Sequence, residues 1–226
     1  MSISSSQEKS MKTQNEIWQE YYKQRKAPSY PTDAIARFFE KYAKSGDKVL
    51  DLGCGAGRHT LMLAQMGFEV SAIDFAKNSI DFTNELLANN SFKADLRVAS
   101  ADALPFCDDY FDALVCYGIH MYGDKDFVEN VTNEIYRVLK KGGKAIIQFR
   151  SKDDYRYKNG EKIGEYQAKS TAAFMKDEYG QVLYYFDEAE IKRVFKDFKD
   201  IKIDYLSRTY DNGGYKISYF LVSLEK

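Results

Sequence analysis

A glycine-rich turn is the feature of this sequence with the clearest chemical meaning. Three glycines alternate with other residues at Gly53, Gly55 and Gly57, directly after an apolar run that ends at Leu52. Glycines allow the backbone to turn tightly and a ligand to approach the main chain closely. A dinucleotide fingerprint places its third glycine one position later than Gly57, so the spacing argues against a nicotinamide dinucleotide. The turn therefore predicts a different ligand at the end of a strand.

Two acidic positions beyond the turn also suggest ligand contacts. Asp74 stands 17 residues after Gly57, where a second apolar run ends. A carboxylate offers two acceptor oxygens on a short side chain, which suits the two hydroxyls of a vicinal diol. Asp102 lies in the segment Ser-Ala-Asp-Ala-Leu-Pro-Phe at residues 100–106. The alternatives are a helix N-cap role for Asp74 and an ordinary surface loop around Asp102.

The chain holds two histidines, and each follows a predicted strand. An imidazole titrates near neutrality and can accept the proton that a hydroxyl loses, so His120 is the predicted general base. The alternative is a histidine that lines or caps a loop, and for His59 this structural role is favoured. Tyr117 ends the fourth predicted strand, where its hydroxyl would orient an acceptor or its ring would pack. His120 and Tyr117 are the predicted catalytic residues.

Alternating strands and helices must bring these residues together. Apolar runs and helical periodicity predict strands at residues 48–52, 68–73, 96–99, 111–117 and 144–149, with helices at 58–66, 78–88 and 125–139 between them. Such alternation predicts a doubly wound α/β fold with a parallel sheet. After a helix at 187–198, strands at 201–209 and 215–224 flank Asn-Gly-Gly, a hairpin signal that makes the last strand antiparallel. The expected sheet is seven-stranded, mostly parallel and Rossmann-like.

Composition and pattern divide the chain into five predicted segments. Residues 1–14 are polar and serine-rich and are expected to form a disordered tail. Residues 15–46 predict an N-terminal helical cap or lid, and residues 47–150 the ligand-binding core. Residues 151–186 predict a small insertion or lid, because this stretch is too long for an ordinary connection. Residues 187–226 complete the sheet.

The composition argues against several classes of protein. The 226 residues include 33 Lys and Arg against 34 Asp and Glu, and residues 151–226 carry 14 of each sign, which gives no field for nucleic acid or an anionic membrane. Three cysteines without paired spacing predict neither disulfides nor a zinc site, and we expect no metal, although carboxylate counting alone leaves a magnesium-assisted mechanism open. No stretch matches a signal peptide or a membrane span, so we expect a soluble, cytoplasmic protein.

Taken in order from residue 49 to residue 149, these motifs resemble the class I S-adenosylmethionine-dependent methyltransferases. The family's first motif is an acidic residue followed by G-x-G-x-G, and Leu-Lys-Lys-Gly-Gly at residues 139–143 resembles the family's turn before the fifth strand. The resemblance implies S-adenosylmethionine as cofactor and S-adenosylhomocysteine as product. It implies that Asp74 holds the ribose and that Asp102 and Ala103 contact adenine. The implied cofactor-binding set is Asp51, Gly53, Cys54, Gly55, Gly57, Asp74, Phe75, Asp102, Ala103 and Tyr117.

A looser resemblance points to small bacterial methyltransferases of metabolites, including tellurite-resistance-type proteins and members from surface-sugar or natural-product pathways. This looser resemblance names no substrate. From the sequence as a whole we expect methyl transfer to oxygen, or in second place nitrogen, of a small polar, phosphorylated or sugar-like acceptor. The segment after Cys116 lacks the N-P-P-Y-type motif of enzymes that methylate nucleic-acid bases. One cation is expected to bind a phosphate or carboxylate on the acceptor. The candidates are Arg150, with Arg156 nearby, and the N-terminal group Lys23, Arg25 and Lys26. The predicted substrate-binding residues are Tyr21, Tyr22, Tyr30, Arg150 and Tyr155.

Two other functions fit the same motifs. A protein or RNA methyltransferase would need a docking surface, which the balanced charge does not indicate. A noncatalytic cofactor-binding module would keep the cofactor motifs without processing an acceptor. An enclosed acceptor cavity would favour an enzyme, whereas a cavity blocked by aromatic side chains would favour the module. We expect a monomer or a homodimer.

Overall fold

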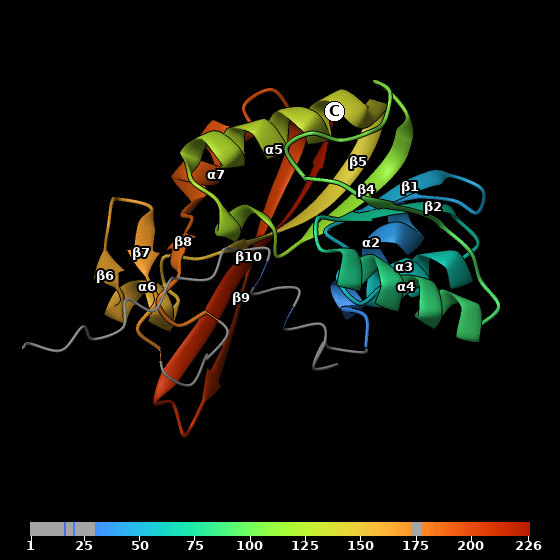
Figure 1. Ribbon diagram of the computed structural model, residues 1–226. Coiled ribbons are helices and arrows are strands. Elements are labelled where there is room, and N and C mark those ends of the chain that lie inside the picture. The colour runs from blue at the N-terminus through green and yellow to red at the C-terminus, as the bar shows by residue number, and fades with distance from the viewer. Residues whose placement is uncertain (1–15, 17–19, 21–29, 173–177) are drawn as a thin grey trace, which may run out of the picture.

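The computed structural model describes Glu16, Glu20 and residues 30–172 and 178–226 of the chain (Figure 1). The predicted tail at residues 1–14 lies outside this part. Within the described part, helices cover both faces of one central sheet, and a second, smaller sheet lies beside one end of it.

In the described residues, the central sheet has seven strands in the order β3-β2-β1-β4-β5-β10-β9. The strands from β3 to β5 are parallel, and β10 is antiparallel to both β5 and β9. This order confirms the predicted doubly wound fold with its antiparallel last strand. The strands are β1 (Lys48–Leu52), β2 (Glu69–Asp74), β3 (Asp95–Val98), β4 (Phe111–Tyr117), β5 (Leu139–Arg150), β9 (Lys199–Tyr210) and β10 (Tyr215–Glu225).

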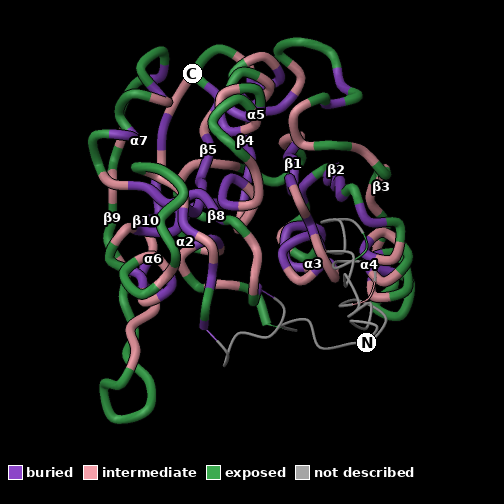
Figure 2. Tube along the Cα trace, turned by 60° about the vertical axis from the view of Figure 1, so that its left-hand side comes forward, coloured by how far each residue is buried: buried purple, intermediate pink, exposed green. Residues whose placement is uncertain are grey.

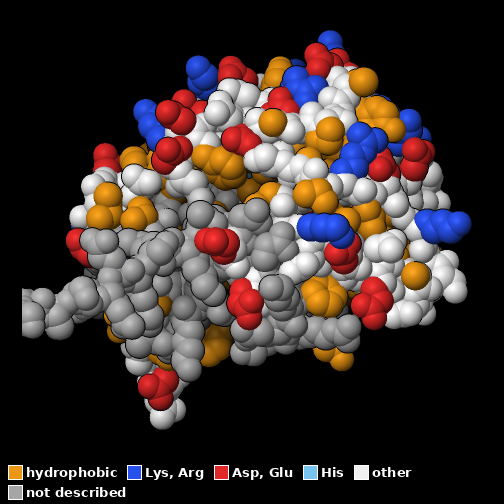
Figure 3. Space-filling model, in the orientation of Figure 1, with side chains coloured by type: hydrophobic (Ala, Val, Ile, Leu, Met, Phe, Trp, Pro, Cys, Tyr) orange, Lys and Arg blue, Asp and Glu red, His pale blue; other side chains and the backbone are white. Residues whose placement is uncertain are grey.

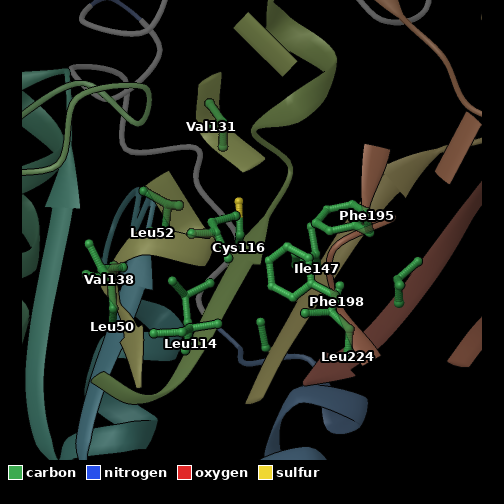
Figure 4. Close-up of a cluster of buried hydrophobic side chains, with 14 of the residues drawn as sticks. Leu50, Leu52, Leu114, Cys116, Val131, Val138, Ile147, Phe195, Phe198 and Leu224 are labelled. Carbon is green, nitrogen blue, oxygen red and sulfur yellow. The ribbon is translucent and has the colours of Figure 1, made fainter. Parts of the chain in front are cut away.

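Neighbouring side chains along the strands enter two separate hydrophobic clusters. On one face, the helices α2 (Asp33–Tyr42), α3 (Arg58–Gln65) and α4 (Lys77–Asn89) pack against residues such as Val49 and Val115. On the other face, α5 (Lys125–Val138) and α7 (Glu188–Val194) cover Leu50 and Cys116 (Figure 4). Because side chains alternate along a strand, a slip by one residue would exchange the two clusters. Burying each such apolar side chain contributes about 1.5–3 kcal/mol, so the register is strongly specified.

The segment at residues 151–186 forms the small second sheet. Its described part contains α6 (Tyr155–Asn159) and the antiparallel strands β6 (Glu161–Lys162), β7 (Gln167–Lys169) and β8 (Val182–Tyr184). A bridge between Ser151 and Phe186 joins the two ends of the segment. The β9–β10 hairpin extends past the end of β5, and its tip is exposed (Figure 2). The carboxyl end of β5 therefore lies between the small sheet and this hairpin.

Two element boundaries differ from the sequence-based expectation. The helix predicted for residues 187–198 ends at Val194, where the chain leaves the helix so that Phe195 and Phe198 pack in the core. Strand β5 begins at Leu139 instead of residue 144. Its register against β4 shifts between Leu139 and Lys144, a stretch that contains the glycine pair, and Gly142 has a φ of 79°. The predicted turn is thus a bulge inside a longer strand.

Candidate active site

The glycine turn joins β1 to α3 at the carboxyl edge of the sheet. Gly53, Gly55 and Gly57 have φ values of 76°, 58° and 83°, in the left-handed region that favours glycine. The amides of Gly53 and Cys54 each donate to the carbonyl oxygen of Ile73 on β2, at 2.9 Å. A Cβ atom on Gly53 would collide with the side chain of Ile119. The absence of a side chain at Gly53 therefore makes room for Ile119, and the two hydrogen bonds to Ile73 hold the turn against β2.

Asp51 supports this turn from beneath. Its Oδ2 accepts a hydrogen bond from Oγ1 of Thr60 on α3 at 2.6 Å, and the residue is only 1% exposed. Burial raises the pKa of Asp51 to about 6, although the Thr60 hydrogen bond opposes this shift. Cys54 is also buried, with its Sγ 3.8 Å from Oγ1 of Thr83. Asp51 and Cys54 hold the turn to α3 and α4, and neither lines the cavity described below.

Asp74 ends β2 with its carboxylate fixed by two backbone amides. Oδ2 accepts from the amide of Gly55 at 3.0 Å, and Oδ1 accepts from the amide of Ala76 at 2.9 Å. Burial raises the pKa of Asp74, while these amide bonds act to lower it. An ionised carboxylate has about four acceptor positions, so this one is oriented and can still accept from a ligand.

A cavity of about 170 Å³ opens beside Asp74. It lies at the carboxyl ends of β1, β2 and β4, where the strand order reverses and doubly wound folds bind ligands. Its walls are mostly apolar, which suits a flat ring system with a few directed polar groups. The lining residues are Leu52, Gly53, Ile73, Asp74, Phe75, Ala99, Ser100, Ala101, Ile119, Tyr122 and Phe127.

The predicted adenine contacts lie just beyond this lining. Ser100 and Ala101 face the cavity, whereas Asp102 and Ala103 follow them in the same loop after β3. Oγ of Ser100 donates to Oδ1 of Asp102, and the amide of Ala103 donates to the carbonyl oxygen of Ser100 at 3.3 Å. The structure therefore brings Gly53, Asp74 and Phe75 of the predicted cofactor set to the cavity.

Tyr117, at the end of β4, packs against the start of α3. The Arg58 guanidinium lies 5.1 Å from the centre of the Tyr117 ring, and the His59 ring centre lies 5.4 Å away. Nε2 of His59 accepts a hydrogen bond from the amide of Thr32 at 3.2 Å. Burial lowers the pKa of His59 to about 3, so the ring is neutral and holds the start of α2 to α3. Tyr30 is 84% exposed and meets Arg58 through its carbonyl oxygen.

His120 does not reach the cavity in this structure. It begins the short helix η1 (His120–Tyr122) and is fully buried, with its ring centre 4.8 Å from that of Phe149 and 6.2 Å from that of Phe195. Nδ1 lies 3.8 Å from Sγ of Cys116, and Nε2 has no hydrogen-bond partner in the described part of the chain. Burial lowers the pKa of His120 to about 3. The structure does not support His120 as general base, because a base must contact its acceptor.

Arg150, one of the candidate anion-binding residues, is held in a buried ion pair. Its Nη1 and Nη2 donate to the carboxylate of Glu178 at 2.8 and 2.9 Å, and Nη1 of Arg156 donates to the same carboxylate at 2.7 Å. Tyr155 starts α6, with its ring centre 6.1 Å from that of Tyr215. Arg150 and Tyr155 thus lie at the carboxyl end of β5.

The remaining predicted substrate-binding residues, Tyr21 and Tyr22, and the candidate cations Lys23, Arg25 and Lys26 lie outside the described residues.

Among the cavity residues that were not predicted as site residues, three come from the same stretch of chain: Ile119, Tyr122 and Phe127. They belong to the connection after β4 and the first turn of α5, where the N-cap Asp124 accepts from the amide of Phe127 at 2.9 Å. Their position in the sequence could have indicated this, because the segment that follows each parallel strand lies at the ligand-binding edge of the sheet. The hydrogen bond from the Tyr122 hydroxyl to Glu178, at 3.3 Å, had no such signal, since the two residues are 56 positions apart.

The described part of the face in Figure 3 shows no large area of one charge. Acidic and basic side chains are mixed over the described part of the face in Figure 3, in keeping with the net charge of −1. In the part of the chain that the structure describes, no helix has the length and apolar character needed to cross a bilayer.

Comparison with known proteins matches residues 49–143 to a family described as a methyltransferase domain. A demethylmenaquinone methyltransferase of Lactobacillus johnsonii is 36% identical over 118 residues, which cover 49% of this chain and 47% of that protein. A probable S-adenosyl-L-methionine-dependent methyltransferase, TehB, of Haemophilus influenzae is 31% identical over 108 residues, 47% of this chain and 37% of that protein. The chain therefore spans less than half the length of these two curated relatives.

Among solved structures, a SAM-dependent methyltransferase from Methanosarcina mazei superposes with a TM-score of 0.68 at 21% identity, covering 83% of this chain and 96% of that one. This likeness concerns the fold. Residues 49–143 thus match a methyltransferase domain, and the chain resembles class I S-adenosylmethionine-dependent methyltransferases of the TehB type.

The cavity residues fit the cofactor of this class. The oriented carboxylate of Asp74 has acceptor capacity left for the ribose hydroxyls. Phe75 and the apolar wall formed by residues 99–101 offer a surface for adenine. The glycine turn lets the remainder of the cofactor approach the backbone at Gly53. These residues would hold S-adenosylmethionine along the edge from β2 to β4.

Proposed function

We propose that this protein transfers a methyl group from S-adenosylmethionine to an oxygen, or in second place a nitrogen, of a small polar metabolite. The observation that supports the proposal is the apolar cavity at the switch point of the sheet with the backbone-fixed carboxylate of Asp74 at its side. The mixed charge over the described part of the face in Figure 3 supports a metabolite over a protein or RNA acceptor.

The bound cofactor supplies a methyl group on a positively charged sulfur, which is already activated for in-line displacement. What the chain must add is proximity and alignment, which can provide much of the rate. Asp74 would fix the ribose, and the apolar lining would hold the adenine ring. Tyr117 ends the strand beside β1, and we propose that its hydroxyl orients the acceptor.

An oxygen acceptor must also lose a proton. Both histidines are buried and held in the fold, His59 by Thr32 and His120 by an aromatic cluster. We therefore propose that the reaction depends on positioning and that the released proton passes to water. This places the main burden of catalysis on the geometry of the sheet edge.

The first test is calorimetric titration with S-adenosylhomocysteine. Asp74→Ala should weaken binding by about 1.5–3 kcal/mol, which is roughly 10- to 150-fold, because charged hydrogen bonds to the ribose are lost. Asp81→Ala is the control, since Asp81 is an exposed carboxylate on α4 that pairs with Lys77 at 2.7 Å. Equal affinity of folded Asp74→Ala and wild type would remove Asp74 from the site. Binding of NADH in place of S-adenosylhomocysteine would overturn the proposed cofactor.

The second test follows methyl uptake from labelled S-adenosylmethionine into hydroxylated, phosphorylated and amine-bearing metabolites. A demethylated quinone is included because one curated relative carries that name. Uptake into a hydroxyl or amine is the expected result. Uptake only into quinone carbon, protein or RNA would contradict the proposed acceptor. Tight cofactor binding with no uptake into any class would instead indicate a noncatalytic module.

A further inference from the structure

Four charged side chains meet inside the protein at the carboxyl end of β5. Arg150 ends β5, Asp154 and Arg156 belong to the start of α6, and Glu178 precedes β8. Each is at most 8% exposed. Two guanidinium groups and two carboxylates give the four side chains a formal net charge of zero. We call these four residues the buried charge cluster.

Asp154 is the fixed counter-ion of this cluster. Its Oδ1 accepts from the backbone amide and Nε of Arg156, at 3.0 and 2.6 Å. Its Oδ2 accepts from Nη2 of Arg156 at 2.7 Å and from the amide of Ser218 on β10 at 3.0 Å. Asp154 also caps α6. Backbone donors from two elements therefore hold this carboxylate in place.

Glu178 is held in a different way, by side chains only. Arg150 donates to both of its oxygens, Arg156 donates to Oε2 at 2.7 Å, and Tyr122 donates to Oε1 at 3.3 Å. Within the described residues, no backbone amide donates to this carboxylate, and Glu178 lies in a turn outside the helices and strands. Any carboxylate or phosphate in this position could accept the same four hydrogen bonds.

The position of the Glu178 carboxylate is connected to the cofactor cavity by one side chain. Tyr122 is one of the residues that line the cavity, and its hydroxyl donates to Glu178. A molecule with its anionic group at the Glu178 position would thus extend toward the place where the cofactor is expected. Strand register agrees, because Arg150 stands two residues beyond Gln148, which is paired with Tyr117 at the end of β4.

Gln148 supplies a second, independent indication of a ligand. It shares a strand face with Arg150, because side chains two apart on a strand point the same way. Gln148 is 7% exposed, and its Oε1 has no hydrogen-bond partner in the described part of the chain. This oxygen lies beside Gly118, 3.7 Å from where a Cβ atom would stand on that glycine. A buried amide oxygen without a donor is unfavourable unless a ligand supplies one.

We propose that Arg150 and Arg156 form the anion-binding part of the acceptor site, that Glu178 occupies it in this structure, and that the acceptor carries a carboxylate or phosphate. The inference rests on the proposed methyltransferase function and specifies its acceptor. When the acceptor's anion replaces the Glu178 carboxylate, the charge around the two arginines remains balanced. The unpartnered Oε1 of Gln148 then accepts from a hydroxyl or amine of the same molecule.

A second carboxylate that is bound by a tyrosine and an arginine provides a control, in which Glu190 is buried and the Arg193 side chain is 42% exposed. Glu190 on α7 accepts from the Tyr184 hydroxyl at 2.7 Å and from Nε and Nη2 of Arg193 at 2.7 and 2.8 Å. The chemistry resembles that of Glu178, with one tyrosine and one bidentate arginine. Tyr184 does not line the cavity. Removing the Glu190 charge should therefore perturb the fold without producing an anion site.

The test is a calorimetric titration of the full chain with inorganic phosphate at low ionic strength, without S-adenosylmethionine. Glu178→Gln keeps the side-chain volume and removes the competing charge, so it should bind phosphate at least 10-fold more tightly than wild type. Adding Arg150→Gln to Glu178→Gln should abolish that gain. Glu190→Gln should bind phosphate within 2-fold of wild type. A folded Glu178→Gln without the gain, or a gain that survives Arg150→Gln, would overturn the proposal.

A parallel titration with acetate separates the two possible anions. Tighter binding of phosphate than acetate in Glu178→Gln indicates a phosphorylated acceptor, and the reverse order indicates a carboxylate, with either order supporting the site. Should Glu178→Gln fail to fold, Glu178→Asp retains the charge on a shorter side chain and should bind phosphate about 3-fold more tightly than wild type. No gain in Glu178→Asp would then overturn the proposal. These titrations contain no S-adenosylmethionine. A negative result for the anion site therefore leaves the Asp74 test of the methyltransferase function unaffected.

Discussion

The two halves of the carboxyl edge are built from different groups. In the cofactor half, from β2 to β4, backbone atoms do most of the positioning, as at Asp74, whose two oxygens accept from the amides of Gly55 and Ala76. In the half beyond β5, charged side chains from separate segments position one another, as Arg150 and Glu178 do. Backbone positioning is local and tolerates many side chains nearby. Positioning by ion pairs between side chains depends on every partner. The half beyond β5 should therefore be more sensitive to single substitutions and better able to distinguish acceptors.

The largest expected effect tests whether Asp154 is the fixed charge of the second half. Asp154→Ala leaves Arg156 buried without its bidentate partner and the Ser218 amide without its acceptor. We expect the free energy of unfolding to fall by about 3–5 kcal/mol, as for other buried ion pairs that lose one partner. Chemical denaturation measures this value. Asp153→Ala is the matched control, because Asp153 pairs with Lys158 at the surface and its loss should change stability by less than about 1 kcal/mol.

If Asp154→Ala and Asp153→Ala had the same small effect, the cluster would not depend on a fixed counter-ion. The distinction between Asp154 and Glu178 would then be lost, and with it the contrast between the two halves.

The next effect in size concerns the pH dependence of the cofactor half. Burial raises the folded-state pKa of Asp51 to about 6 from an ordinary value of 3.8. An acid with a raised folded-state pKa destabilises the fold as pH rises through the interval between the two values. Asp51→Asn removes this titration. Its unfolding free energy relative to wild type should therefore rise by about 2–3 kcal/mol between pH 4 and pH 7 and stay constant above pH 7.

Denaturant titrations of wild type and Asp51→Asn at four pH values between 4 and 8 measure this difference. Titrations that are common to both proteins cancel in it. A difference that does not change with pH would show that Asp51 titrates normally and that the base of the glycine turn is open to water.

The same contrast explains what could be predicted from the sequence. The sheet order and the glycine turn follow from patterns within short segments, such as the strand that ends at Leu52 and the glycines after it. Asp74 could be found because it lies at a regular distance from that turn. The charge cluster could not be assembled in this way, because Glu178 is 28 positions from Arg150, and Ser218 is 64 positions from Asp154.

His120 is a second residue whose surroundings could not be predicted from the sequence around it. Its position after β4 correctly indicated the edge of the sheet, and a histidine at that edge suggested a base. The neighbours that seal it, Phe149 and Phe195, come from β5 and the end of α7, and no local pattern reveals them. Sequence patterns thus located the edge, whereas the direction of a side chain at that edge depended on packing between distant elements.

The smallest expected effect tests His120 itself. Its folded-state pKa is lowered to about 3 from 6.5 by burial, so stability that is present above pH 6.5 is lost as the pH falls below that value. His120→Phe fills a similar volume among Phe149 and Phe195 and cannot be protonated. The free energy of unfolding of the variant minus that of wild type should be about 2 kcal/mol larger at pH 5 than at pH 7. Its rate of methyl transfer should stay within 2-fold of wild type. A drop of 100-fold or more in a folded variant would instead indicate a general base and would mean that His120 turns toward the acceptor during the reaction.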